Sequence, residues 1–344
     1  MRTLFNIHNW IAVDWEKGLL TPLIDYSRKL HFFLSNEKDC EQCPIHIRIT
    51  ASLPPENLRK TLIPAAERFA MGDGIFEVSQ QWGRRRWKFW VAGLDTNHVS
   101  IYYSFPFLQR FEKTTAMFPD YLIAMNVLQP VMEYKLLELS GIVIHACAYA
   151  KNGKAVILAG RGGARKSTIM MNKIRTGAEF LADDLLIVKD GRVWSYPTTD
   201  TYFDYFYLHE KDESVNLRSM LGAFFHIARR RPISFPVADS AIPKKIGLLI
   251  NSHNQEYRII GNGTADPAFL RRMMANDRLE SLDCGDEEES HSRYLFHFNQ
   301  VLGNDAWNCH WKRYMDILSD NFLGLPYTIV QTGKRFTPEI MEHL

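Results

Sequence analysis

The feature that most constrains the fold of this chain is a strand-like run that leads through a glycine-rich loop into a helix-like run. Residues 154–160 read KAVILAG, residues 160–168 read GRGGARKST, and residues 167–177 read STIMMNKIRTG. A strand, a glycine-rich turn and a helix in this order form the setting in which a match to a phosphate-binding P-loop becomes credible. The alternative is a glycine-rich turn that merely precedes a helix.

The residues of this loop suit a nucleoside triphosphate. Backbone N–H groups of the turn, together with the positive end of the helix behind it, attract phosphate oxygens. The ammonium group of Lys166 would neutralise charge on the β- and γ-phosphates, and the hydroxyl of Ser167 would bind Mg²⁺. We therefore expect ATP and Mg²⁺ as cofactors. The expected nucleotide-binding residues are Gly160, Gly162, Gly163, Ala164, Arg165, Lys166, Ser167 and Thr168.

Arg165 departs from the P-loop pattern, which has glycine immediately before the lysine. Glycine permits close approach of the backbone to phosphate and an unusual backbone dihedral. An arginine at this position must either find an ordinary conformation or accept strain. Its guanidinium group could compensate by contacting phosphate directly. Arg165 therefore either adds a phosphate contact or weakens nucleotide binding.

Two adjacent carboxylates, Asp183 and Asp184, interrupt an otherwise apolar run, AEFLADDLLIV at residues 178–188. Neighbouring side chains of a strand point to opposite faces, so one of the two could face the loop. A carboxylate in an apolar setting requires a cation or hydrogen-bond donors. Ser167, Asp183 and Asp184 are therefore the expected metal ligands, and one aspartate is the expected general base. The alternative is a bulge or a strand end that faces water.

His145 lies in a further strand-like run, IVIHACAYA at residues 142–150. A lone histidine in a strand is most simply structural. The order of the segments that follow His145 along the chain favours a catalytic role instead. The histidine-containing strand, the turn KNGK, the strand AVILAG, the loop GRGGARKST, the helix end RTGAEF and the pair LADD together resemble the nucleotide-binding core of the HPr kinase/phosphorylase family. The resemblance covers residues 145–197.

This resemblance implies the fold of phosphoenolpyruvate carboxykinases and a kinase activity. Members of the family phosphorylate a serine hydroxyl of a protein or peptide, or sometimes a small alcohol, with ATP and Mg²⁺. Thr168 stands where HPr kinase has a glutamate, which argues mainly against HPr itself as the substrate. The catalytic residues that the resemblance implies are His145, Lys166, Asp183 and Asp184.

We interpret the chain as an ATP-dependent phosphotransferase that moves the γ-phosphate in line to a hydroxyl acceptor. Two hypotheses from different functional classes stay open. One is a nucleotide-binding sensor, or pseudokinase, without turnover. The second is a nucleic-acid-binding module that uses Trp82, Arg84–Arg86 and Trp87 of the segment WGRRRWKFW. Assembly into homo-oligomers also remains open.

The sequence divides near Phe118 into two modules, α+β overall. Residues 1–117 hold aromatic-rich runs at 45–53, 74–82, 85–94 and 98–107, which predict strands of a largely antiparallel sheet, and a helix is expected over 54–72. This module would recognise substrate or mediate assembly. Residues 118–344 form the predicted α/β P-loop domain, which begins with a helical run over 118–141 that Pro130 should kink or split.

Composition limits the partners and the compartment. The formal net charge of +2 creates no global field for nucleic acid or an anionic membrane. No run of about eighteen uncharged apolar residues occurs, and residues 1–18 lack a signal-peptide pattern. The five cysteines are odd in number and scattered, which suits a reducing compartment. We therefore expect a cytoplasmic protein without a membrane partner.

Two short segments have competing interpretations. Cys40 and Cys43 form a single C-x-x-C with His46 nearby, but a zinc site usually needs a second pair. We favour a reduced surface turn. The basic run Arg229–Arg231 lies in the expected catalytic half, where it would contact substrate or phosphate, or simply form a solvated loop.

Overall fold

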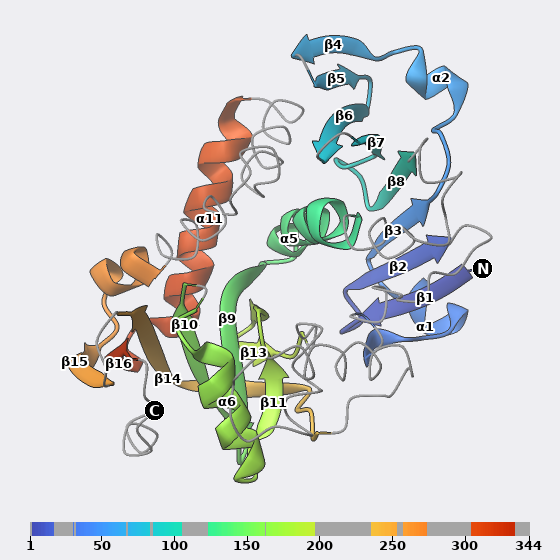
Figure 1. Cartoon of the computed structure of the whole chain (residues 1–344). Helices are drawn as coiled ribbons and strands as arrows, with labels where there is room; N and C mark the ends of the chain where they lie inside the picture. The colour runs from blue at the N-terminus through green and yellow to red at the C-terminus, as the bar shows by residue number, and fades with distance from the viewer. Residues whose placement is uncertain are drawn as a thin grey trace. The chain divides into compact units, whose positions relative to one another are not determined.

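The chain folds into two compact units (Figure 1). One unit comprises Met1–Leu139 and Cys284–His310, and the other comprises Ser140–Asp283 and Trp311–Leu344. The predicted boundary between residues 117 and 118 lies outside the described residues, and the helical residues that follow it group with the first unit. The computed structural model describes residues 2–16, 30, 32–66, 68–82, 85–104, 123–161, 163–196, 235–252, 257–273 and 304–333.

Each unit is built on one large mixed sheet with few helices, so the α/β character predicted for the chain is confirmed at this level. The sheet of the first unit has the order β1-β2-β3-β8-β7-β6-β5-β4. It is antiparallel except where β3 pairs in parallel with β2 and with β8. Its strands are β1 (Arg2–Ile7), β2 (Ile11–Glu16), β3 (Ile45–Thr50), β4 (Ile63–Ala66), β5 (Phe69–Gly72), β6 (Ile75–Trp82), β7 (Arg85–Ala92) and β8 (His98–Ser104).

The runs predicted as strands at 45–53, 74–82, 85–94 and 98–107 correspond to β3, β6, β7 and β8. The helix expected over 54–72 was wrong. Only α2 (Glu56–Arg59) is helical there, and β4 and β5 follow as an antiparallel pair. Pro64 explains the difference, because it lacks the N–H that a helix interior requires but is tolerated in an edge strand such as β4.

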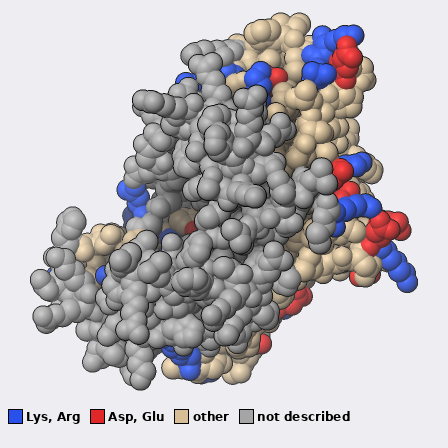
Figure 2. Space-filling model, turned by 45° about the vertical axis from the view of Figure 1, so that its right-hand side comes forward, with Lys and Arg blue, Asp and Glu red and all other residues tan. Residues whose placement is uncertain are grey.

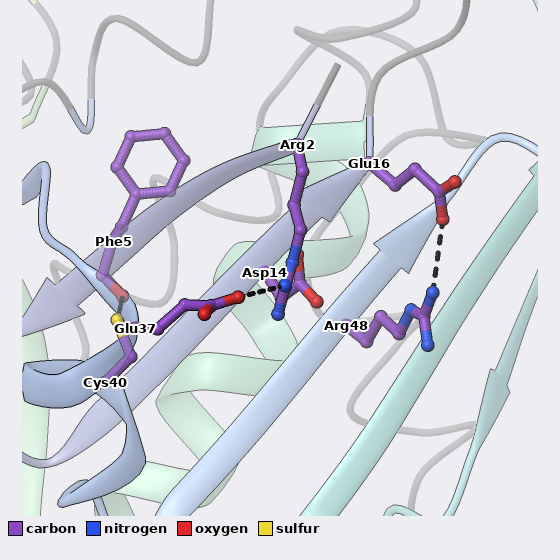
Figure 3. Close-up of polar contacts among 7 residues, drawn as sticks. All are labelled: Arg2, Phe5, Asp14, Glu16, Glu37, Cys40 and Arg48. Carbon is purple, nitrogen blue, oxygen red and sulfur yellow. Dashed lines mark hydrogen bonds and ion pairs between the residues drawn. The ribbon is translucent and has the colours of Figure 1, made fainter.

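Ion pairs join neighbouring elements at the amino-terminal end of the first sheet (Figure 3). The Arg2 guanidinium lies 2.9 Å from Asp14 of β2 and 2.5 Å from Glu37 of α1 (Glu37–Glu41). Arg48 of β3 lies 3.3 Å from Glu16 of β2. These pairs are largely exposed to solvent, so each adds little stability. The buried side chains of the strands, Trp15 and Ile47 among them, form the core instead.

The helical run before the second unit changes its winding just ahead of Pro130, where the sequence predicted a kink or a split. Residues Ala124–Leu128 form a π-helical turn, and α5 (Gln129–Glu138) continues as an α-helix with the proline in its first turn. Gln129 N donates to the Ala124 carbonyl five residues earlier, so the helical run is continuous, and its wider π winding accommodates a proline that has no N–H to donate.

The second unit's sheet has the order β10-β9-β12-β13-β14-β16-β15, with β11 paired to β9. β14 also pairs in parallel with β10, so the ladder returns to the strand from which it began. The long strand β9, curved in Figure 1, carries β12 on its first half and β10 and β11 on its second half. The strands are β9 (Gly141–Lys151), β10 (Lys154–Gly160), β11 (Glu179–Ala182), β12 (Leu185–Lys189), β13 (Arg192–Trp194), β14 (Ser240–Asn251), β15 (Arg258–Thr264) and β16 (Pro326–Thr332).

The expected single strand over 178–188 is in fact two strands. β11 ends at Ala182 and β12 begins at Leu185, so Asp183 and Asp184 lie in the break. The strand does end at the aspartates, but only Asp184 is exposed to water, because Asp183 is buried. A buried carboxylate requires hydrogen-bond donors or a cation, so the break places Asp183 where such partners are needed.

Helix α6 (Lys166–Arg175) contacts β9, β10 and β11 (Figure 1). Its buried side chains recur at helical spacing, which explains why this segment winds as a helix against the sheet. The apolar cluster beneath it includes Cys147, Tyr149, Leu158, Ile169, Met170, Ile174 and Phe180.

Two helical segments lie towards the end of the chain. One is α11 (Asn304–Phe322). Residues 267–273 are helical as well. Within the part of the chain that the structure describes, no helix has the length and apolar character needed to span a membrane.

Candidate functional site

The glycine-rich loop connects the carboxyl end of β10 to the amino end of α6, as the sequence predicted. Gly160 has φ 155°, and a Cβ on it would lie 2.4 Å from the carbonyl oxygen of Leu249 in β14. Gly163 has φ 75°. The first glycine is therefore required by the close approach of β14, and the second by a left-handed backbone. Gly162 lies outside the described residues.

Arg165 adopts the left-handed conformation, with φ 68° and ψ 22°. Of the two outcomes that the sequence left open for its backbone, strain is the observed one. A non-glycine residue in this region costs about 1–2 kcal/mol. The carbonyl of Arg165 accepts the hydrogen bond from Ile169 N at 3.2 Å, so the helix begins directly after it. At this position the loop therefore has the left-handed backbone conformation that favours glycine, although the residue is an arginine.

Lys166 points back towards the loop rather than into solvent. Its side chain is buried, and its Nζ donates a hydrogen bond to the carbonyl oxygen of Gly160. The same ammonium nitrogen lies 3.4 Å from His145 Nε2. A buried positive charge is therefore held where the N–H groups of the first helical turn also converge.

His145 and Asp184 form a close pair on the other side of this lysine. His145 Nε2 lies 2.8 Å from Asp184 Oδ1. The pairing of β9 with β12 sets His145 opposite Leu185, the residue that follows Asp184, and Ala146 N donates to the Asp184 carbonyl at 3.1 Å. The strand break therefore brings these two predicted site residues together beside Lys166.

Asp183 occupies a different environment from Asp184. Asp183 is only 5% exposed, whereas the Asp184 side chain is 47% exposed. The thiol of Cys147, two residues after His145 on β9, donates to the Asp183 carbonyl oxygen and lies 3.5 Å from Asp183 Oδ1. Burial, and next the negative charge of Asp183, raise the pKa of this thiol well above its usual value. Sequence reasoning missed Cys147 because its role depends on a contact across the fold.

The donor set suits Mg²⁺ in chemical type. Ser167 and Thr168 lie half-buried in the first turn of α6, and hydroxyl and carboxylate oxygens are ligands that Mg²⁺ accepts. Among the described residues, no group of three His, Cys, Asp or Glu side chains is arranged to hold a metal ion. This arrangement is compatible with magnesium, which usually binds through one or two carboxylates, water and the phosphates of a substrate.

A second residue that sequence reasoning missed lies at the end of β14. Asn251 is the last residue of that strand, and its side chain is exposed. A Cβ built on Gly163 would lie 3.3 Å from Asn251 Nδ2, so the amide is adjacent to the loop. The contact becomes visible only through the parallel pairing of β14 with β10, because the two segments are far apart in the sequence.

The segment with Cys40 and Cys43 lies in the first unit, away from the glycine-rich loop in sequence. Cys40 and Cys43 are free, as expected for reduced thiols, but both are buried, so the expected surface location was wrong. The Cys40 thiol donates to the Phe5 carbonyl, and the Cys43 thiol donates to Asn6 Oδ1, so both thiols face inward towards β1. The Cys40 contact is drawn in Figure 3. His46 stacks on His98 instead, with ring centroids 5.0 Å apart.

The aromatic and basic segment proposed for nucleic acid is partly buried. Trp87 is only 2% exposed and packs beside Phe89, so it offers no free face for base stacking. Arg84 and Arg229–Arg231 lie outside the described residues. On the face drawn in Figure 2, described Lys and Arg side chains lie beside Asp and Glu side chains instead of forming one broad basic patch.

The sequence was compared with protein-family models and with curated proteins. No protein-family model matches the chain, and no curated protein matches it significantly. The interpretation of the site therefore depends on its own residues and geometry.

Proposed function

We propose that the protein is an ATP-dependent phosphotransferase with a hydroxyl acceptor, related to the HPr kinase/phosphorylase family and its phosphoenolpyruvate carboxykinase-like P-loop fold. The observation that carries the proposal is that His145 Nε2 lies 3.4 Å from Lys166 Nζ and 2.8 Å from Asp184 Oδ1, beside a glycine-rich loop. Phosphoryl transfer to an alcohol needs a phosphate site and a carboxylate that accepts the proton, and His145 would position that carboxylate.

Lys166 and the first turn of α6 would bind the phosphates. The lysine is already held beneath the loop by the Gly160 carbonyl, so a short movement of its ammonium group would exchange that carbonyl for a phosphate oxygen. Mg²⁺, bound by the Ser167 hydroxyl and an aspartate, would neutralise charge that develops on the phosphates. Thr168 and Arg165 would complete the loop.

Asp184 is the better candidate for the general base. Its side chain is accessible, whereas Asp183 is buried against Cys147. An acceptor hydroxyl that approaches from solvent would meet Asp184 first, and His145 would orient that carboxylate. Asp183 would then either bind the metal or stabilise the break between β11 and β12. The acceptor would be a serine of a protein or peptide, or a small alcohol, and the first unit would recognise it or mediate assembly.

Isothermal titration with Mg-ATP, paired with a phosphate-transfer assay, tests this proposal. We expect wild-type protein to bind and turn over ATP with an acceptor, and Lys166→Ala to remove both properties while the circular dichroism spectrum stays unchanged. Asp184→Asn should bind ATP but not transfer phosphate. Asp190→Asn is the matched control, because Asp190 lies in the exposed β12–β13 turn with φ 53°, a conformation that asparagine tolerates.

A nucleotide sensor is the second candidate function, and the strained backbone of Arg165 is the observation that favours it. A protein that stores strain at its nucleotide loop could use nucleotide to change shape instead of transferring phosphate. Binding of Mg-ATP without turnover on any acceptor, retained in Asp184→Asn, would support the sensor and contradict the kinase.

A further inference from the structure

The glycine-rich loop and the carboxyl end of β14 touch at two places. The ideal Cβ positions of Gly160 and Gly163 lie 2.4 Å from the Leu249 carbonyl oxygen and 3.3 Å from Asn251 Nδ2. Leu249 and Asn251 are two residues apart, so they belong to one face of β14. The loop therefore lies over the end of this strand, and Asn251 is beside it.

The end of β14 is held firmly in the sheet. Asn251 pairs with Thr332 in the parallel ladder with β16, and Ser252 N donates to the Thr332 carbonyl at 3.2 Å. The buried Thr332 hydroxyl donates to the Ile250 carbonyl at 3.3 Å. The backbone of Asn251 is thus fixed on both sides of the residue, while its side chain remains exposed and able to meet a ligand.

The position of Asn251 in the sheet matches where ligands bind. β10, β14 and β16 run parallel, so the carboxyl ends of all three lie at one edge of the sheet. In α/β folds with open or closed sheets, ligands usually bind at the carboxyl ends of the parallel strands. At this edge β10 contributes the loop, and β14 contributes an amide with two N–H donors.

We propose that Asn251 is a nucleotide-binding residue whose side-chain amide donates a hydrogen bond to a phosphate oxygen held by the loop. The inference rests on the proposed function, because it assigns a contact within the same nucleotide site. It extends that site from the loop and α6 to a second strand. Asn251 positions the phosphates from β14, whereas Lys166 does so from α6.

Two substitutions separate this role from simple packing against the loop. Asn251→Ala removes the donor and should weaken Mg-ATP binding about tenfold, since a hydrogen bond to a charged group is lost. Asn251→Asp keeps the shape but places a carboxylate beside the phosphates, so it should bind more weakly still. A packing role predicts the reverse order, with aspartate tolerated better than alanine.

The experiment is titration of a fluorescent ATP analogue with Mg²⁺ into wild type, the two Asn251 variants, Lys166→Ala and Asn262→Asp. Asn262 is exposed on β15 opposite Thr328, four positions along β16 from Thr332, and controls for the added charge. The expected order of affinity is wild type equal to Asn262→Asp, then Asn251→Ala, then Asn251→Asp. Affinity within twofold of wild type in Asn251→Asp, with Lys166→Ala impaired, would overturn the role of Asn251 alone. Absence of binding in wild type would overturn both this role and the proposed function.

Discussion

The Nε2 atom of His145 lies 2.8 Å from Oδ1 of Asp184, while the same nitrogen lies 3.4 Å from Nζ of Lys166. An ammonium group only donates hydrogen bonds and a carboxylate only accepts them, so one ring nitrogen cannot serve both. The shorter distance favours an Nε2–H that donates to Asp184. Lys166 is then held mainly by the Gly160 carbonyl, which leaves its charge available to a phosphate.

A double-mutant cycle tests this coupling. His145→Ala and Asp184→Asn should each lower kcat/KM for phosphate transfer by about 10²-fold or more, because general base catalysis is lost. The double variant should be little worse than either single variant, since the two residues act as a unit. Multiplied effects in the double variant would show that they act independently.

Relief of strain is expected at Arg165. Arg165→Gly should raise the free energy of unfolding by about 1 kcal/mol relative to Arg165→Ala, because only glycine adopts φ near 68° without cost. Both variants lack the guanidinium group, so a comparison of their ATP affinities with wild type isolates its phosphate contact. Urea unfolding monitored by fluorescence gives the stabilities, and equal stability of the two variants would contradict the strain.

The contact between Cys147 and Asp183 predicts that two substitutions of Cys147 lower the transfer activity to different degrees. Cys147→Ser keeps a donor to the Asp183 carbonyl and should retain most of the transfer activity, whereas Cys147→Ala should lose more, because the oxygens of a buried aspartate lose a partner. Steady-state kinetics at saturating ATP measures the difference. Greater activity in the alanine variant would contradict this role of the thiol.

Stability should fall at alkaline pH through Cys43. Burial, and then the negative charges of Cys40 and Asp39, raise the pKa of Cys43 from 9.0 to about 11. The folded state then holds the proton more tightly than the unfolded state, so this contribution is full below pH 9 and declines between pH 9 and 11. Urea unfolding at several pH values should show the difference between wild type and Cys43→Ala shrink over that window. A constant difference would contradict it.

The elements with local signals could be predicted from the sequence. The strand, loop and helix around residues 154–177 follow from apolar runs and from glycine placement, and the hairpins at KNGK and KDG have Asn152 and Asp190 with positive φ in their turns. The strand β15 was not predicted, because RIIGNGT contains two glycines and is exposed along its length. The amino-terminal strands β1 and β2 were also missed, although they form a hairpin around His8 and Asn9.

Only some of the site residues could be predicted from the sequence. Lys166, His145 and Asp184 could be named because their residue types and order suggest phosphoryl transfer. Which aspartate meets the histidine depends on the break between β11 and β12, which no local pattern specifies. Cys147 and Asn251 act through contacts across strands, and those contacts follow from sheet pairing rather than from sequence spacing.

The most direct test of the central claim is transfer of label from γ-labelled ATP to a hydroxyl acceptor. Purified protein, Mg²⁺ and fractions of a heat-treated extract, in which other kinases are inactivated, should yield a labelled serine-containing protein, a peptide or a small alcohol. Lys166→Ala and Asp184→Asn should give no label, and Asp190→Asn should match wild type. Label that persists in Lys166→Ala, or wild-type protein that binds ATP yet labels no acceptor, would contradict the proposed kinase activity.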